Sequence, residues 1–305
     1  MANLLWHSKS RPKILNETPF KTEEEFEKIV FDSKEFLSDI FLLKRQIRGG
    51  GKPGIPDIIG VDTDGKVCII EMKNVAVDEN IISQLVKYAI WAKNYPDSIK
   101  ALWLENENRP DDIEIDWRNI EVRLIVIAPS VMQSAINSAQ EIVSNVEFIE
   151  ISRWIDGKNH FFLIKKLEKE VKKSKTKPSH GLQEYNVEYY KSRRNVNSVN
   201  HFIKYTKELN KIVKKNNWKL EMKYNANNCV FKSGFFRAFG IKWIGSKSFA
   251  LFVMISDVEA KKFKNPITKY QSQWKQVVYL IEPGKTKLSD YTKVLKFGYE
   301  KLIGK

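Results

Sequence analysis

The stretch that most constrains the fold is PDIIGVDTDGKVCIIEMK, residues 56–73. Two apolar runs flank the segment DTDG, whose glycine suits the last position of a three-residue loop where φ must be positive. This pattern predicts a β-hairpin centred on Asp64, with strands at about 56–62 and 66–73. Because side chains alternate along a strand, the register of this hairpin decides which of its charged residues meet.

The hairpin register brings three charged side chains together. Residues whose numbers sum to 128 pair about Asp64, so Asp57 faces Glu71, with Cβ atoms about 4.5–5.5 Å apart. Lys73 lies two residues further on and points to the same face, whereas the Met72 side chain points away and leaves its carbonyl oxygen near the acids. Charged residues are seldom buried unless they are paired or bind a metal.

Two carboxylates at this separation repel each other, and each pKa is raised unless a cation intervenes. Mg²⁺ binds one or two carboxylates and keeps water ligands, so we expect a Mg²⁺ site formed by Asp57, Glu71 and the carbonyl of Met72, with Mn²⁺ as a substitute. The metal can polarise a water and counter charge on a phosphodiester, while Lys73 positions the nucleophile or stabilises that charge. The competing interpretation is a surface ion pair at the end of a strand.

These residues resemble a known signature. The pair PD at 56–57, followed after thirteen residues by EMK at 71–73, resembles the motif of the PD-(D/E)XK nucleases. QLVKY at 84–88 is similar to the QxxxY motif of RecB-type members, and EFEKIVF at 25–31 resembles their first-helix motif. The resemblance covers roughly residues 22–130 and implies a restriction-endonuclease-like fold with Mg²⁺-dependent phosphodiester hydrolysis. It is closest to archaeal and bacterial nucleases that act on branched, mismatched or single-stranded DNA.

The resemblance adds two residues to the site. It implies that Glu27 completes the metal site, although the acids at 23–25 crowd the same turn and a helix N-terminus attracts acids in any case. Gln84 begins a stripe at helical spacing and is expected to bind the water, the hydration shell of the metal or a phosphate, whereas Trp91 and Tyr95 of that stripe are expected in the core.

A second EMK triplet, at 221–223, has no opposed aspartate. We interpret it as part of an ordinary strand.

The remaining pattern predicts an α/β fold in which a mixed sheet is flanked by helices. Thr22 is expected to cap a helix whose apolar positions continue at helical spacing as far as Phe41. After the hairpin we expect a helix at about 79–95, the strand EVRLIVIAP, a helix from about Val131, and strands near 146–151 and 160–166. The last third predicts a smaller α+β domain with a curved antiparallel sheet: a helix at about 195–216, strands at about 220–223, 235–243, 249–255 and 276–281, and a helix at about 287–303.

The charge is distributed unevenly along the 305 residues, whose number itself favours two domains. Residues 1–167 contain 22 basic and 26 acidic residues, a net charge of −4, and residues 168–305 contain 30 and 11, a net of +19. We therefore expect a nuclease domain at 1–167, a linker at 168–182 and a basic domain at 183–305. Such a basic domain is typical of nucleic-acid binding, but a solvated surface or a dimerisation role also fits its charge.

Basic residues in two segments are candidate contacts for nucleic acid, with DNA favoured over RNA. Arg45, Arg48 and Lys52 surround the glycine-rich GGGKPG loop, and Arg193 and Arg194 end the segment YYKSRR.

The sequence contains no apolar stretch long enough to cross a bilayer, and its two cysteines lie far apart without metal-ligand spacing. We expect a cytoplasmic protein with reduced thiols. The expected function is a Mg²⁺-dependent deoxyribonuclease, in particular an endonuclease, of the repair, recombination or restriction and defence type. The alternative is a non-enzymatic nucleic-acid or protein adaptor on a nuclease-like scaffold, and a homodimer remains open.

Overall fold

The computed structural model describes residues 3–6, 12–45, 56–142, 146–167 and 185–304. The predicted linker at 168–182, Arg48 and Lys52 lie outside these ranges. The chain divides into two compact units, and two short segments of its first half belong to the second unit. The first unit is Met1–Phe36, Leu42–Glu107 and Ile115–Gly181, and the second is Leu37–Phe41, Asn108–Glu114 and Leu182–Lys305.

The first unit is built on a six-stranded mixed sheet with the order β3-β4-β5-β6-β7-β8. Strands β5, β6 and β7 run parallel to one another, and β4 and β8 are antiparallel to their neighbours β5 and β7. The strands are β3 (Ile40–Arg45), β4 (Ile58–Asp62), β5 (Val67–Met72), β6 (Val122–Ala128), β7 (Val146–Asp156) and β8 (Asn159–Leu167).

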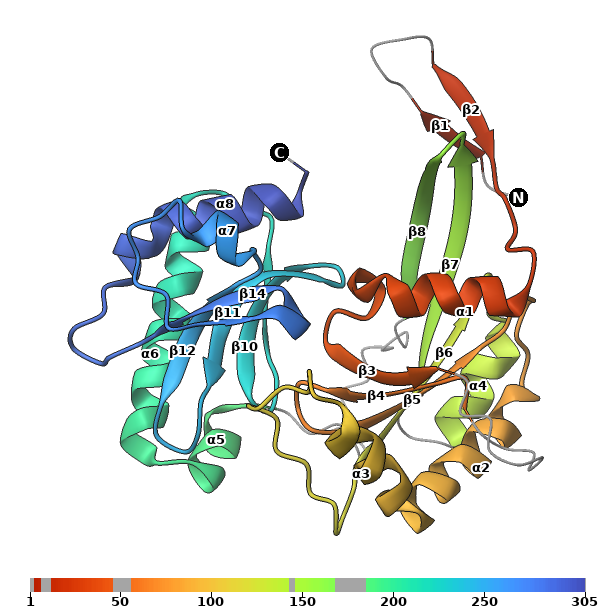
Figure 1. Ribbon diagram of the computed structural model, residues 1–305, viewed down its shortest axis with the longest axis horizontal. Coiled ribbons are helices and arrows are strands. Elements are labelled where there is room, and N and C mark those ends of the chain that lie inside the picture. Colours follow the sequence, from red (N-terminus) through yellow and green to blue (C-terminus); the bar gives the residue numbers. More distant parts are fainter. Residues whose placement is uncertain (1–2, 7–11, 46–55, 143–145, 168–184, 305) are drawn as a thin grey trace, which may run out of the picture. The chain divides into compact units, whose positions relative to one another are not determined.

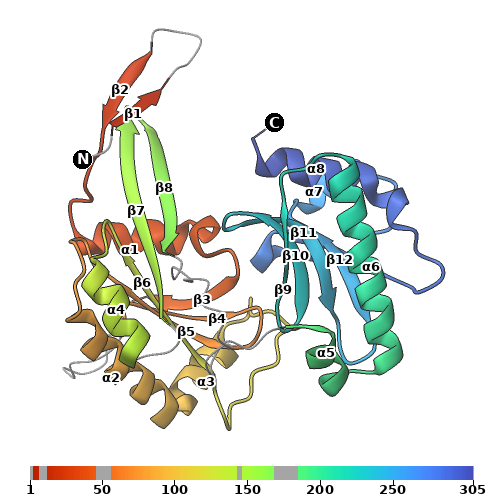
Figure 2. The ribbon, with the colours of Figure 1, turned by 180° about the vertical axis from the view of Figure 1, so that it is seen from behind.

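Helices cover both sides of this sheet (Figures 1 and 2). Helix α1 (Glu23–Asp32) lies on one side, and α2 (Ile81–Asn94) and α4 (Gln133–Ile142) lie on the other. Every residue of β4 and β5 is buried as a result. Helix α3 (Pro96–Glu105), which the sequence pattern did not predict, follows α2. The predicted mixed sheet flanked by helices is confirmed.

The central hairpin has the predicted register. Ile58 pairs with Ile70 and Val61 with Val67, so paired residue numbers sum to 128. Gly65 takes a φ of 83°, and its N–H donates to the carbonyl of Asp62 at 3.0 Å. The turn therefore fixes the register, and the register places Asp57 and Glu71 at the same end of the two strands.

The first helix is shorter than predicted. Thr22 caps it by accepting the N–H of Glu25 at 3.0 Å, as expected, but the helix ends at Asp32. A 3₁₀ turn (Lys34–Leu37) and β3 follow, so the expectation that the helix runs to Phe41 was wrong. The run Ile40–Leu43 is continuously apolar, which suits a buried strand, and its agreement with helical spacing was coincidental.

A two-stranded ribbon of β1 (Asn3–Trp6) and β2 (Lys13–Asn16) belongs to the first unit as well, and the sequence pattern did not predict it. Directly after β2, Glu17 forms a β-bridge with Trp154 of β7 and so joins the ribbon to the six-stranded sheet.

The second unit contains an antiparallel sheet with the order β13-β14-β12-β11-β10-β9. Helices α6 and α8 pack on one face of the sheet, where Phe202, Leu209, Phe239 and Val294 are fully buried. The predicted α+β domain is confirmed, with β10 and β13 as strands that the pattern did not predict. The elements are α5 (Val187–Arg193), α6 (Val196–Lys215), β9 (Glu221–Tyr224), β10 (Asn228–Ser233), β11 (Phe236–Trp243), β12 (Phe249–Val253), α7 (Asp257–Ala260), β13 (Lys269–Gln271), β14 (Gln276–Leu280) and α8 (Thr292–Leu302).

Both cysteines, Cys68 and Cys229, are buried free thiols. Burial raises the pKa of Cys229 to about 12. Within the described ranges, no helix combines the length and apolar character needed to cross a membrane.

Candidate active site

Asp57 and Glu71 lie at the same end of the β4–β5 hairpin. Asp57 Oδ2 accepts the N–H of Met72 at 2.7 Å, and Glu71 is only 1% exposed. Burial, followed by the charge of Glu71, raises the pKa of Asp57 to about 7. Burial also raises the pKa of Glu71, although its hydrogen bond with Lys73 opposes that shift. The site therefore holds more buried negative charge than its own cation neutralises.

Lys73 supplies the positive charge beside these two acids. Its Nζ lies 2.5 Å from Glu71 Oε1 and 3.6 Å from Glu23 Oε1. Burial alone would lower the pKa of Lys73, but its hydrogen bond with Glu71 and the charges of Glu71, Glu23 and Asp57 outweigh burial and raise it. Lys73 is therefore a protonated donor at neutral pH and not a free base.

Gln84 approaches the same carboxylate from α2. Its Nε2 donates to Glu71 Oε1 at 2.7 Å and to the hydroxyl of Tyr88 at 2.5 Å. Trp91, further along the stripe, packs half-buried against the core as expected. Tyr95 is 59% exposed, so its predicted core position was wrong. The reason is that Tyr95 follows the last residue of α2 and has a non-helical backbone, so the helical spacing no longer sets the direction of its side chain.

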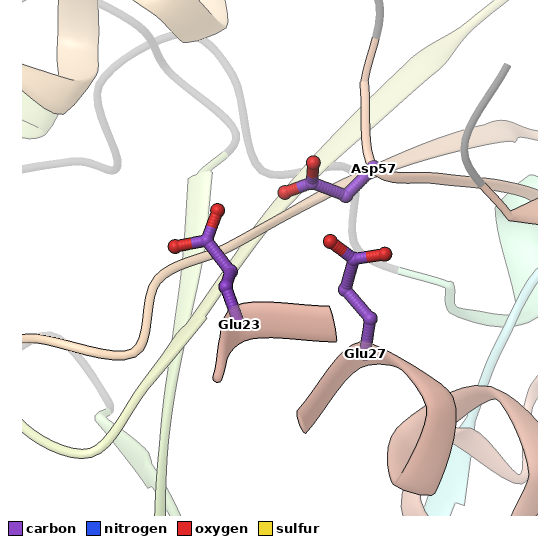
Figure 3. A group of neighbouring side chains, drawn as sticks. All are labelled: Glu23, Glu27 and Asp57. Carbon is purple, nitrogen blue, oxygen red and sulfur yellow. The ribbon is translucent and has the colours of Figure 1, made fainter. Parts of the chain in front are cut away.

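A second acidic group adjoins the pair. Glu23 and Glu27 of α1 and Asp57 each offer a carboxylate oxygen, and these oxygens lie within 4.8 Å of one another. Figure 3 shows the two helix side chains and Asp57 converging from α1 and from the residue before β4. Glu27 is 4% exposed and lies 3.8 Å from Arg45 Nη1.

Sequence reasoning did not select Glu23, because acids in a first helical turn are common. The i, i+4 spacing of Glu23 and Glu27 was the available signal, since it puts both side chains on one face of the helix.

The residues present fit a divalent cation. Glu71 Oε1 is occupied by Lys73 and Gln84, whereas Glu71 Oε2 is buried and has no hydrogen-bond partner in the part of the chain that the structure describes. An unpaired buried carboxylate oxygen is costly, and a metal ion satisfies it. The oxygens that lie within 4.8 Å of one another belong to Glu23, Glu27 and Asp57, and Glu71 is not a member of that group. All of these donors are carboxylates, which are ligands that Mg²⁺ prefers.

Arg153 of β7 anchors the chain that leads into α1. It is 2% exposed and donates to the carbonyls of Thr18 and Pro19 at 3.2 and 2.6 Å and to Glu25 at 2.6 Å. Its guanidinium also lies 4.3 Å from the ring centre of Phe20. The hydrogen bond from Arg153 lowers the pKa of Glu25.

Asn74, next to Lys73, ties the same segment to the end of β5 by donating to the carbonyl of Phe20 at 2.8 Å. Arg153 and Asn74 together fix the start of the helix that carries Glu23 and Glu27. Sequence reasoning missed both, because only tertiary contacts show their role.

The candidate nucleic-acid residues have different surroundings. Arg45 lies beside Glu27, and Arg48 and Lys52 are outside the described residues. Arg193 is exposed, with its guanidinium 4.3 Å from the ring centre of Tyr189. Arg194 donates to the carbonyl of Gly245 at 2.8 Å and to Asn227 at 2.5 Å, and burial lowers its pKa. The Arg194 side chain thus makes contacts inside the second unit.

The second EMK triplet forms β9, an edge strand of the second sheet. Glu221 is exposed and lies 3.8 Å from Lys232. The interpretation of this triplet as an ordinary strand is confirmed.

Endonucleases are the class of protein to which this chain is similar among curated sequences. Two of them are the endonuclease NucS of Pyrococcus horikoshii, 30% identical over 117 residues, and that of Pyrococcus abyssi, 31% identical over 123 residues. Proteins of this kind have the restriction-endonuclease-like fold. Each alignment covers 37% of this chain, which spans only 36% and 40% of the length of the two relatives. No family model matches the chain.

The similarity to solved structures covers only part of each chain. A repair endonuclease from Pyrococcus abyssi is 23% identical with a TM-score of 0.30, over 44% of this chain and 49% of that one. A complex of EndoMS with double-stranded DNA is 18% identical with a TM-score of 0.31, over 49% of this chain and 64% of that one.

Proposed function

We propose that this protein is a Mg²⁺-dependent endonuclease that hydrolyses phosphodiester bonds in DNA. The observation that carries the proposal is the pair of buried Glu71 and half-buried Asp57, with its raised pKa values and its bonded Lys73. Buried acids that repel each other are costly, and a site that binds a cation gives them a use. The similarity to the two NucS endonucleases supports the same activity and favours DNA over RNA as substrate.

The proposed metal ligands are the carboxylates of Asp57, Glu71 and Glu27 and the carbonyl of Met72, to which the geometry adds Glu23. Mg²⁺ bound by them would counter the charge that develops on the phosphodiester and increase the acidity of a water molecule, and Mn²⁺ would substitute.

The protein side chains around that centre have distinct tasks in this proposal. Lys73, whose Nζ is bonded to Glu71, supplies a positive charge and N–H donors beside the scissile phosphate, which stabilises the transition state. Gln84 binds Glu71 Oε1 and limits the rotation of that carboxylate. The N–H of Met72 does the same for Asp57. The two carboxylates are thereby held in fixed positions, and fixed catalytic groups are a large part of catalytic rate enhancement.

Finer assignments rest on the same proposal. The hydrogen bond between Gln84 and Tyr88 supports a RecB-type QxxxY site, because both motif residues then act together on Glu71. We also propose a role in repair, recombination or restriction and defence, and a cytoplasmic location. The basic domain at 183–305 is proposed to position the DNA. A homodimer would allow two sites to cut two strands.

Cleavage of a substrate panel tests the proposal. Labelled single-stranded, duplex, flapped and mismatched DNA are incubated with the full chain in Mg²⁺, Mn²⁺ or EDTA. We expect cutting that requires the metal and that Glu71→Gln removes. Glu221→Gln is the matched control, because Glu221 belongs to the same triplet on an exposed edge strand and should cut normally. A full chain that binds DNA but cuts none of the four substrates would favour the non-enzymatic adaptor.

A further inference from the structure

Five lysines form a row on the exposed face of α6, which we call the α6 lysine stripe. All five side chains are exposed. The first four follow one another at three or four residues and the fifth lies four residues after the third, which confines them to an arc of about 100°. The opposite face of the helix is buried in the core of the second unit. The stripe consists of Lys204, Lys207, Lys211, Lys214 and Lys215, and the buried face of Val199, Phe202, Tyr205, Leu209 and Val213.

The positive charge of the stripe is not balanced by nearby acids, in contrast to the charge of many other lysines of the second unit. None of its five ammonium groups forms an ion pair with the residues that the structure describes, and Glu208 is the single acid in the sequence of α6. Elsewhere in the unit, lysines of surface segments pair with nearby acids: Lys261 with Asp257, Lys285 with Glu282, Lys296 with Glu300, and Lys301 with Glu259. Other exposed lysines of the unit that form no ion pair with the described residues, such as Lys219, Lys247 and Lys264, are spread over separate segments, whereas α6 carries five of them along one face.

The dimensions of the stripe suit a polyanion. From Lys204 to Lys215 the helix rises about 16 Å, at about 1.5 Å per residue. One strand of a duplex presents a phosphate about every 3.4 Å along its axis, so four or five phosphates lie within about that length. Lysine is a flexible point charge, which suits contacts to a repeating backbone more than recognition of a particular base.

An anionic membrane does not fit the same helix. Helices that bind a bilayer surface insert an apolar face, and the apolar face of α6 is packed against the sheet.

We propose that the α6 lysine stripe is the surface on which the second unit binds the phosphodiester backbone of the nucleic-acid substrate. The inference rests on the proposed nuclease function and names the surface that holds the substrate. It differs from the sequence-based choice of Arg194, whose guanidinium already binds Gly245 and Asn227.

Binding of a labelled DNA duplex, measured on the full chain in EDTA at several salt concentrations, tests the proposal. Replacing all five stripe lysines by glutamine should weaken binding at least tenfold at low salt. It should also reduce the slope of log K against log salt by about four units, at about 0.9 per phosphate contact.

A control variant carries the same loss of five charges at Lys219, Lys247, Lys264, Lys287 and Lys293, which are exposed lysines outside α6. The control should keep most of the affinity and of the salt slope. Circular dichroism and thermal unfolding establish that both variants are folded, as expected for exposed positions.

Three results would overturn the inference. The first two are equal losses of DNA affinity in the stripe and control variants, and unchanged DNA binding by the stripe variant. The third is competition by polyglutamate that is as strong as that of DNA at the same charge concentration, which would indicate an acidic protein as partner. Cleavage of the same duplex by the wild type in Mg²⁺ separates the two proposals. Cleavage with unchanged binding by the stripe variant contradicts the inference alone, whereas stripe-dependent binding without any cleavage contradicts the proposed function alone.

Discussion

The fold disfavours the ionised form of Asp57. An aspartate in an unfolded chain titrates near pH 3.9, whereas burial and Glu71 raise the pKa of Asp57 to about 7. Between these values the folded state binds a proton that the unfolded state has lost. The free energy of unfolding therefore falls as pH rises through this window.

The first prediction concerns Asp57→Asn in metal-free buffer. The variant removes this proton linkage, so it should be more stable than the wild type above pH 7, by about 2 kcal/mol or more, and gain little near pH 4. Chemical denaturation in EDTA from pH 4.5 to 8 measures the difference. Parallel pH profiles for the two proteins would show that Asp57 ionises without cost. Added Mg²⁺ should stabilise the wild type but not the variant.

Lys73 gives the second prediction. Lys73→Ala should lower turnover by about 10² to 10⁴-fold, because the charge beside the phosphate is lost, while Mg²⁺ binding is kept or strengthened. Lys73→Arg should not restore turnover, since the planar guanidinium places its charge differently from a compact ammonium. Single-turnover cleavage rates and Mg²⁺-dependent melting curves measure the two effects separately. Near-normal turnover of Lys73→Arg would reduce Lys73 to a structural partner of Glu71.

How far the sequence predicts the site depends on how local each contact is. The placement of Asp57 opposite Glu71 follows from a tight turn and strand alternation, both of which operate over a few residues. Glu23 was open to prediction from helical spacing but indistinguishable from an ordinary first-turn acid. Arg153 carries no such signal, because its partners are carbonyls and an acid more than 100 residues away.

At the scale of elements, α1 is positioned by a buried cation rather than by its own apolar face alone. Arg153 links Thr18, Pro19 and Glu25 to β7, and this linkage holds the start of the helix that carries Glu23 and Glu27.

The third prediction is that Arg153→Met destabilises the protein by about 3–5 kcal/mol, since two carbonyls and Glu25 lose their donor in a buried site. It should also reduce cleavage, although the hydrogen bonds of Arg153 go to Thr18, Pro19 and Glu25 and not to the two acids of the site. Urea denaturation and cleavage rates at a temperature where the variant is folded give the two values.

Arg123 offers a control, because its bonds to Asp62 and Glu147 lie away from α1, so a folded Arg123→Met variant should retain its cleavage rate. Equal cleavage rates for the wild type and a folded Arg153→Met variant would contradict the positioning role.

Prediction of whole elements succeeded where one pattern dominated. The helix at 79–95 and the strand in EVRLIVIAP were found as α2 and β6, because each has a clear period or a long apolar run. The end of α1 was missed since an apolar run in the next strand continued the helical spacing by chance. Helix α3 and the β1–β2 ribbon are short, and tertiary contacts decide whether such segments are ordered.

At the scale of the whole molecule, the second unit is not a single stretch of sequence. Asn108–Glu114 belongs to it, and Asp112 from that segment pairs with Lys242 at 2.5 Å. Lys242 is 7% exposed and also lies 2.5 Å from Gln271 Oε1. Burial lowers the pKa of Lys242, while Asp112 opposes that shift. Asp112 therefore supplies the counter-charge of a buried lysine.

The fourth prediction follows from this pair. Asp112→Asn should cost about 2–4 kcal/mol of stability, because it leaves a buried ammonium without its counter-charge. The neighbouring Asp111→Asn is the matched control, since Asp111 and its partner Lys269 are both exposed, and it should cost less than about 1 kcal/mol. Chemical denaturation of both variants measures these costs. Equal effects of the two substitutions would show that Lys242 does not depend on Asp112.

The same arrangement bears on how the chain can be divided. A fragment from residue 182 onward lacks Leu37–Phe41 and Asn108–Glu114, which are parts of the second unit. Such a fragment should melt at a lower temperature than the full chain, so surface variants of the intact protein are the better means of assigning DNA binding to the basic domain.

The central claim is that Asp57 and Glu71 act as one cation-dependent cleavage site. Its most direct test is the single-turnover cleavage rate at saturating Mg²⁺ for the wild type, Asp57→Asn, Glu71→Gln and the double variant. Groups that act as a unit are non-additive, so each single variant should lose about 10³-fold or more and the double variant should lose no more than the worse single one. Wild-type rates in either single variant would contradict the claim.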